Sequence, residues 1–182
     1  NKNQTPLNTL NKALMDRGFS ISEAELFIRI LLNLVPRAEY KKIIDNHPSI
    51  FIKNIGASSS LMCLLAGLGR SETLCLINSI DTKLFDVNNS FKENILYHAA
   101  SHKRITTLIQ LHQIKPNLFK SNNDFSLSTL CKALKPCHFN GDNNSNQIEA
   151  LVAIGHSLDF DFIHQWVAHA GESAYGYIKK IT

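Results

Sequence analysis

The chain has 182 residues, 44% of them hydrophobic, and a formal net charge of +4, so it can bury a core as one domain or as one array of stacked units, which excludes a disordered protein. No apolar run approaches the roughly 20 residues that a membrane span requires. The basic residues are scattered and the pI is near 8.9, whereas nucleic-acid binding usually needs a clustered stripe, so we expect a soluble protein that binds no nucleic acid.

The first predicted element is an amphipathic helix over residues 5–17, with Gly18 as its stop. A second helix begins at a capping box, Ser20 followed three residues later by Glu23, in which the hydroxyl and the carboxylate satisfy exposed backbone amides. Apolar residues at helical spacing then continue over 24–35, which predicts a well-buried helix.

The middle of the chain, from Ser60 to Leu134, repeats itself at one fixed offset along the sequence, which is the separation between Leu84 and Leu118. The pairs at this offset are Leu84 and Leu118, Phe85 and Phe119, Asn88 and Asn122, Asn89 and Asn123, Phe91 and Phe125, and Leu96 and Leu130. A degenerate copy precedes them, because residues 47–62 match 81–96 and a shorter helix is expected over 37–45. A fixed period indicates one supersecondary unit stacked on copies of itself, since one unit cannot bury its apolar face alone.

Each unit is predicted to contain two helices and a long polar loop. In the first clear unit, residues 62–68 form a short helix, Gly69 turns the chain, and Ser71 begins a second helix. About fifteen residues rich in Asp, Asn and Ser then lead to the next helix, over 93–102, which is too long a connection for a simple helix hairpin. The recurrent Leu-Phe followed by Asn-Asn predicts an extended arm with a turn at its tip.

The third unit is interrupted. Its first helix, over 126–135, stops at Pro136, and a stretch near 137–146 rich in Asn and Gly separates it from the second helix. Insertions in stacked repeats form surface loops and are often functional. The tail offers a further helix over 162–170 and a last helix after Gly171.

The residues Leu65-Ala66-Gly67-Leu68-Gly69 through Leu76-Ile77, and Leu96-Tyr97-His98-Ala99-Ala100, resemble the ankyrin repeat. The resemblance covers about residues 21–170 and departs from the family where Ser58, Lys92 and Ser126 replace the glycine of the finger. The period of the chain also suits tetratricopeptide repeats, whose units span about 34 residues, but the long Asn-rich arm between helix pairs favours the ankyrin-like alternative. The Asn- and Lys-rich composition is typical of an AT-rich bacterial source, and divergent ankyrin-like modules from such sources resemble effectors that act in a host cell.

The resemblance implies an all-α fold, an α-solenoid of stacked helix-turn-helix units with finger loops. We expect a capping helix in residues 1–20, an array in 21–170, and a C-terminal cap in 166–182. The predicted units are 21–54, 55–88, 89–122, and 123–165 with an insertion near 137–146.

The resemblance also implies a non-catalytic module that binds a partner protein through its concave face and fingers. The predicted partner-binding residues are Asn89, Phe91, Glu93, Ser101, His102, Asn123, Asp124, Phe125, Leu127 and Lys135. Gly67 and Leu68 correspond to the same inner-helix positions as Ser101 and His102. Two alternatives stay open for Phe91 and Phe125, since they are either exposed aromatic anchors or packing between neighbouring fingers.

Other chemistry has weaker support. Cys131, Cys137 and His138 could ligate zinc with a distant His156 or His164, but the paired spacing of a zinc knuckle is missing. Cys137 and His138 could also form a nucleophile and base pair, but adjacent residues rarely act on one another in this way. Glycines form no phosphate-binding run. We therefore predict no catalytic residue, no metal and no cofactor; the alternatives are a substrate-recruiting domain of a larger enzyme or effector, and a small hydrolase using Cys137.

Localisation is predicted from the cysteines and from the start of the chain. The four cysteines fit a reducing compartment, so we expect a cytoplasmic protein, or one in the host cytosol if it is a secreted effector. The chain has no signal-peptide pattern and no initiator Met, which indicates a processed chain or a piece of a longer protein.

Overall fold

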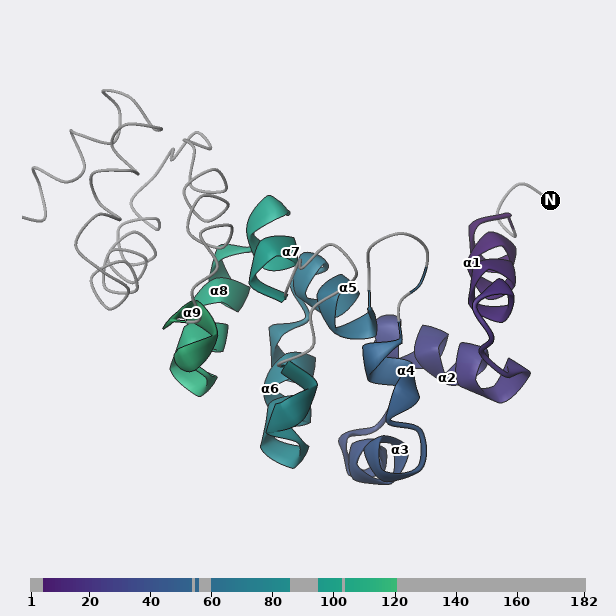
Figure 1. Cartoon of the computed structure of the whole chain (residues 1–182), viewed down its shortest axis with the longest axis horizontal. Coiled ribbons are helices and arrows are strands. Elements are labelled where there is room, and N and C mark those ends of the chain that lie inside the picture. Colours follow the sequence, from purple (N-terminus) through teal and green to yellow (C-terminus); the bar gives the residue numbers. More distant parts are fainter. Residues whose placement is uncertain (1–4, 54, 56–59, 86–94, 103, 121–182) are drawn as a thin grey trace, which may run out of the picture. The chain divides into compact units, whose positions relative to one another are not determined.

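The computed structural model describes residues 5–53, 55, 60–85, 95–102 and 104–120 (Figure 1). The helices in these residues are α1 Thr5–Asp16, α2 Ile21–Leu31, η1 Arg37–Glu39, α3 Tyr40–Asn46, α4 Ser49–Ile52, α5 Leu61–Gly67, α6 Ser71–Ile80, η2 Thr82–Phe85, α7 Ile95–Ser101, α8 Ile105–Ile114 and α9 Asn117–Lys120. This part of the chain contains no strand element, which confirms the all-α class for the described residues.

The helix boundaries repeat at the same interval as the sequence. α5 and α7 are equal in length and begin at Leu61 and Ile95, and α6 and α8 are equal in length and begin at Ser71 and Ile105. Both intervals equal the period of the sequence repeat. The same interval separates the start of η1, at Arg37, from the start of α6. The recurrence in the sequence therefore corresponds to a recurrence of secondary structure.

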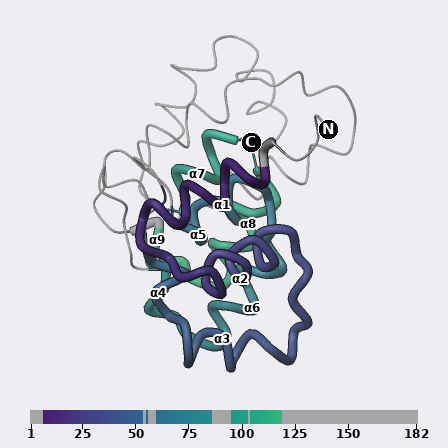
Figure 2. The backbone as a smooth tube through the Cα atoms, turned by 90° about the vertical axis from the view of Figure 1, so that its right-hand side faces the viewer, coloured from purple at the N-terminus to yellow at the C-terminus, as the bar shows by residue number. Residues whose placement is uncertain are grey.

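The N-terminal helices form a hairpin whose connection matches the predicted signals. Gly18 ends the first helix with a φ of +77°, and Lys53 Nζ donates to its carbonyl oxygen at 2.7 Å. The Ser20 hydroxyl accepts from the amide of Glu23 at 3.2 Å, and the Ser20 amide donates to Glu23 Oε2 at 2.8 Å. The predicted capping box is therefore present. α1 and α2 lie side by side in both views of the backbone (Figures 1 and 2).

Internal contacts divide the chain into two compact units. The described residues of the first lie within Asn1–Leu65 and Glu72–Ile95, and those of the second within Ala66–Ser71 and Leu96–Thr182. The first unit has an aromatic core in which Phe27, Phe51 and Phe85 are fully buried. The second buries Leu96, Ala99, Ala100, Leu108 and Leu111. Each unit therefore has its own apolar core.

Residues at matching positions of the repeat are buried alike. Tyr40, Leu74 and Leu108 are all buried at one repeat position, and Ile43, Ile77 and Leu111 at another. Leu31, which the repeat aligns with the buried Leu65, is only half-buried and is the last residue of α2. The second helix of each unit thus presents the same apolar side to a core.

One predicted element differs from the structure. We expected Leu84-Phe85 to begin an extended arm, but the pair lies in the short helix η2, with both side chains buried. The Asp81 carboxylate accepts from the amide of Lys83 at 2.9 Å, which closes a turn of the kind that Asp favours. Burying the two apolar side chains stabilises a compact turn there more than an exposed strand. The rest of the predicted arm, residues 86–94, lies outside the described residues.

Candidate protein-binding surface

Two of the predicted partner-binding residues, Ser101 and His102, lie in the described part of the second unit. Ser101 is the last residue of α7, His102 follows it, and both are exposed. The other predicted partner-binding residues lie outside the described residues: Asn89, Phe91, Glu93, Asn123, Asp124, Phe125, Leu127 and Lys135. Their role stays a prediction, and the candidate surface has to be built around the first two.

Hydrogen bonds at the end of α7 orient the His102 ring. His102 Nδ1 lies 3.0 Å from the carbonyl oxygen of His98, and Ser101 Oγ donates to the same oxygen at 3.2 Å. A hydrogen bond in this contact requires a proton on Nδ1, because a carbonyl oxygen only accepts, and Ser101 Oγ also lies 3.1 Å from Nδ1. The rings of His98 and His102 are stacked, with centroids 6.5 Å apart and planes at 12°. His102 therefore stands in a defined orientation on an exposed helix end.

The C-terminal end of α5 packs closely against the residues that follow α7. A Cβ added at Gly67 would lie 3.2 Å from His102 Nδ1, and one added at Gly69 would lie 3.2 Å from Arg104 Cδ. Arg104 Nε donates to the carbonyl oxygen of Gly67 at 2.8 Å, which places a cation at the negative end of the helix. The two glycines thus make room for the His102 and Arg104 side chains.

An exposed leucine lies at the centre of these contacts. Leu68 is 48% exposed and stands between the two glycines against which His102 and Arg104 pack. Arg70, two residues further on, is also exposed. We refer to Leu68, Arg70, Ser101, His102 and Arg104 as the Leu68 patch.

Among the described residues of the second unit, the Leu68 patch has cations and there is no carboxylate side chain. Residues 66–71 contain no Asp or Glu, and neither do residues 94–123. In the first unit, by contrast, exposed cations have acidic neighbours: Lys41 Nζ lies 3.1 Å from Asp45 Oδ2. The described residues of the second unit therefore expose Arg70 and Arg104 together with the apolar Leu68. At such a surface the arginines can donate hydrogen bonds to carboxylate oxygens, and Leu68 can contact an apolar side chain.

Neither of the titratable groups whose pKa is raised supplies an activated nucleophile. Burial, with a contribution from Glu72, raises the pKa of the Cys75 thiol, and burial raises the pKa of Tyr40. A raised thiol pKa reduces the fraction of reactive thiolate. The described residues include no group of three His, Cys, Asp or Glu side chains that could hold a metal ion. The zinc and nucleophile candidates of the sequence analysis lie outside the described residues: Cys131, Cys137, His138, His156 and His164.

The sequence analysis named part of this candidate surface and did not name its arginines. The repeat alignment identified Leu68, Ser101 and His102, whereas Arg70 and Arg104 were not among the predicted binding residues. A sequence signal for the arginines is the absence of Asp and Glu from 94 to 123, because the local distribution of charge shapes the surface potential beyond what the net charge shows.

The chain was compared with protein-family models, curated proteins and solved structures, and none of them matches it. Among the described residues, none of the helices has the length and apolar character to cross a membrane.

Proposed function

We propose that this protein is a non-catalytic protein-binding module, an ankyrin-like α-solenoid that holds a partner protein on its concave face and finger loops. The recurrence of helix boundaries at the period of the sequence repeat carries the proposal, because stacked copies of one helix pair are the architecture of binding solenoids. In such an array the side chains are already ordered by their neighbours, so they lose little entropy when a partner docks.

The Leu68 patch is the proposed point of contact on the second unit. The hydrogen bond from Arg104 Nε to Gly67 holds one edge of the guanidinium, and the remaining N–H groups can donate to a carboxylate in a forked geometry. Leu68 then supplies apolar contact area next to the charge. The partner segment that fits best therefore has an acidic side chain beside an apolar one.

A pull-down with the whole chain as bait, read by mass spectrometry, tests this function. Leu68→Ser and Arg70→Glu should each remove the captured partner while leaving the melting temperature unchanged, since both side chains are exposed. The matched controls are Leu34→Ser, at a site 61% exposed, and Lys42→Glu, which makes the same change of charge in the first unit.

The result separates the Leu68 patch from the predicted fingers. If folded Leu68→Ser and Arg70→Glu variants capture the partner as well as the native chain does, the contact lies elsewhere, and the double variant Phe91→Ser with Phe125→Ser tests the fingers next. A chain that captures no specific protein in any variant contradicts the proposed function.

A further inference from the structure

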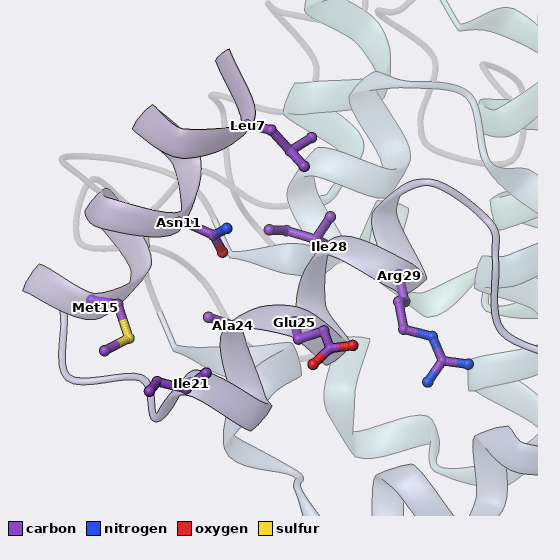
Figure 3. A pocket seen from close by; sticks show the side chains of 8 residues that line it. All are labelled: Leu7, Asn11, Met15, Ile21, Ala24, Glu25, Ile28 and Arg29. Atoms are coloured by element: carbon purple, nitrogen blue, oxygen red, sulfur yellow. The ribbon is translucent and has the colours of Figure 1, made fainter. Parts of the chain in front are cut away.

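Two arginines of the first unit lie near carboxylates. Arg29 Nη2 is 3.9 Å from Glu39 Oε2, and Arg37 Nη2 is 3.9 Å from Glu72 Oε2. Arg29 also lines a groove between α1 and α2 together with Glu25 (Figure 3). The apolar side chains that this groove exposes are Leu7, Met15 and Ile21. The positive charges of Arg29 and Arg37 are therefore balanced by acidic residues of their own unit.

The arginines of the Leu68 patch have no such neighbours. Arg70 and Arg104 are exposed, and neither makes an ion pair among the described residues. The described residues of the second unit contain no Asp or Glu. Within this part of the chain, the two positive charges therefore face solvent without a compensating carboxylate.

Contacts with the turn after α5 bring the Arg104 side chain close to Arg70. A Cβ added at Gly69 would lie 3.2 Å from Arg104 Cδ. Arg70 is the next residue, and its Cα lies about 3.8 Å from that of Gly69. Arg104 Nε donates to the carbonyl oxygen of Gly67 at 2.8 Å, which restrains the guanidinium and leaves the N–H groups of both Nη atoms to bind a ligand. The two arginine side chains can therefore reach the same ligand.

We propose that Arg70 and Arg104 bind the phosphate of a phosphorylated side chain on the partner protein. This inference rests on the proposed function and names the acidic group that the patch binds. A phosphorylated side chain carries about two negative charges at neutral pH and has three strong acceptor oxygens, so it can balance both arginines and accept hydrogen bonds from both guanidinium groups. A carboxylate carries a single charge, and a bidentate contact with one arginine already uses both of its oxygens. The other arginine would then keep its charge uncompensated.

The apolar side chain beside the arginines favours a phosphorylated protein over a nucleic acid. Leu68 is 48% exposed and precedes Gly69, against which Arg104 packs, so it can contact an apolar residue next to the phosphorylated one. Proteins that bind single-stranded nucleic acids combine a cationic groove with aromatic side chains on which the bases stack. The Leu68 patch contains no Phe, Tyr or Trp. The segment that fits is therefore a phosphorylated Ser, Thr or Tyr beside an apolar residue.

Fluorescence anisotropy of labelled peptides mixed with the whole chain tests the phosphate. The peptides have a central phosphoserine, phosphotyrosine, glutamate or serine, a leucine on each side of it, and random residues beyond. At least one phosphorylated peptide mixture should bind about tenfold or more tightly than the glutamate mixture, because the second arginine adds hydrogen bonds to a charged group. A labelled single-stranded oligonucleotide of random sequence serves as the nucleic-acid probe and should bind more weakly than that mixture.

Variants of Arg70 separate the forked contact from the charge. Arg70→Gln should weaken binding of the phosphorylated peptides about tenfold or more and leave the melting temperature unchanged, since the side chain is exposed. Arg70→Lys keeps the charge without the fork and should restore only part of the affinity. The matched control is Arg37→Gln, at an exposed arginine of the first unit, which should bind the peptides as the native chain does.

Several outcomes would overturn the phosphate proposal. They are failure of every phosphorylated peptide to bind, equal binding of the phosphorylated and glutamate peptides, and phosphopeptide binding that Arg70→Gln leaves unchanged. Tighter binding of the oligonucleotide than of every phosphopeptide would assign the arginines to a nucleic acid instead. The pull-down is independent of these peptides, so a partner that the native chain captures and Leu68→Ser loses would keep the proposed function standing while the phosphate proposal fails.

Discussion

Replacing Gly69 by alanine measures the cost of the left-handed turn that follows α5. Gly69 has a φ of +76°, a conformation that costs an L-residue about 1–2 kcal/mol. The added Cβ would also meet Arg104 Cδ at 3.2 Å, a contact that the flexible side chain can relieve by a small shift. Backbone strain therefore dominates, and we expect Gly69→Ala to lose about 1–2 kcal/mol, or about 2–8 °C in melting temperature for a chain of this size.

Urea unfolding followed by circular dichroism, with Gly69→Asn beside Gly69→Ala, separates backbone strain from side-chain contact. Asparagine tolerates the left-handed region better than alanine does, although its Cβ meets Arg104 in the same way. If strain dominates, the asparagine variant loses less stability despite its larger side chain. Equal losses in the two variants would show that the Arg104 contact decides the cost, and no loss in either would refute the reasoning altogether.

Gly67 provides the matched comparison. It ends α5, and its φ lies outside the left-handed region, so alanine gains about 1 kcal/mol in helix propensity while its Cβ pushes against the exposed His102 ring at 3.2 Å. We expect Gly67→Ala to be close to neutral in the same assay. A large loss would mean that the His102 ring cannot move aside.

Three further predictions concern the core, the capping box and a thiol. Leu108 is fully buried, so Leu108→Ala should lose about 2–5 kcal/mol in urea unfolding, whereas Leu34→Ala, at an exposed site, should change little. The pKa of Glu23 is lowered chiefly by the hydrogen bond from the Ser20 amide; burial opposes this effect, and the hydroxyls of Ser20 and Ser49 and the charge of Lys53 add smaller lowering contributions. The ionised form is therefore favoured in the folded state, and its contribution is present above the unfolded pKa and lost as pH falls through the folded pKa. The melting temperature of the native chain should exceed that of Glu23→Gln at neutral pH, and the difference should fade below about pH 4. Burial raises the pKa of the Cys75 thiol, so iodoacetamide should alkylate Cys75 more slowly at pH 8 in the folded chain than in urea, as measured by peptide mass spectrometry.

Each of these predictions has an outcome that contradicts it. Equal stability of Leu108→Ala and the native chain would contradict the burial of the repeat position. A difference between Glu23→Gln and the native chain that grows in acid would reverse the sign of the pKa shift. Equal alkylation of Cys75 in folded and unfolded chains would show that the thiol is open to solvent.

The sequence by itself determined the features that depend on neighbouring residues. Gly18 and Gly69 were identified as turns because positive φ is a local property of glycine, and both have it. The box of Ser20 and Glu23 was identified because its hydrogen bonds span only three residues. The period of the repeat located equivalent helices because recurring apolar side chains fill equivalent places in a core.

The tertiary structure alone decided the features that depend on distant residues. Leu84-Phe85 forms a short helix instead of an extended arm, because the core of its unit takes up both side chains. Arg104 belongs to the Leu68 patch through a carbonyl 37 residues away, a partner that local spacing does not reveal. The groove between α1 and α2 likewise exists because two amphipathic helices meet without covering all of their apolar side chains, and only the packed hairpin shows which of them remain exposed.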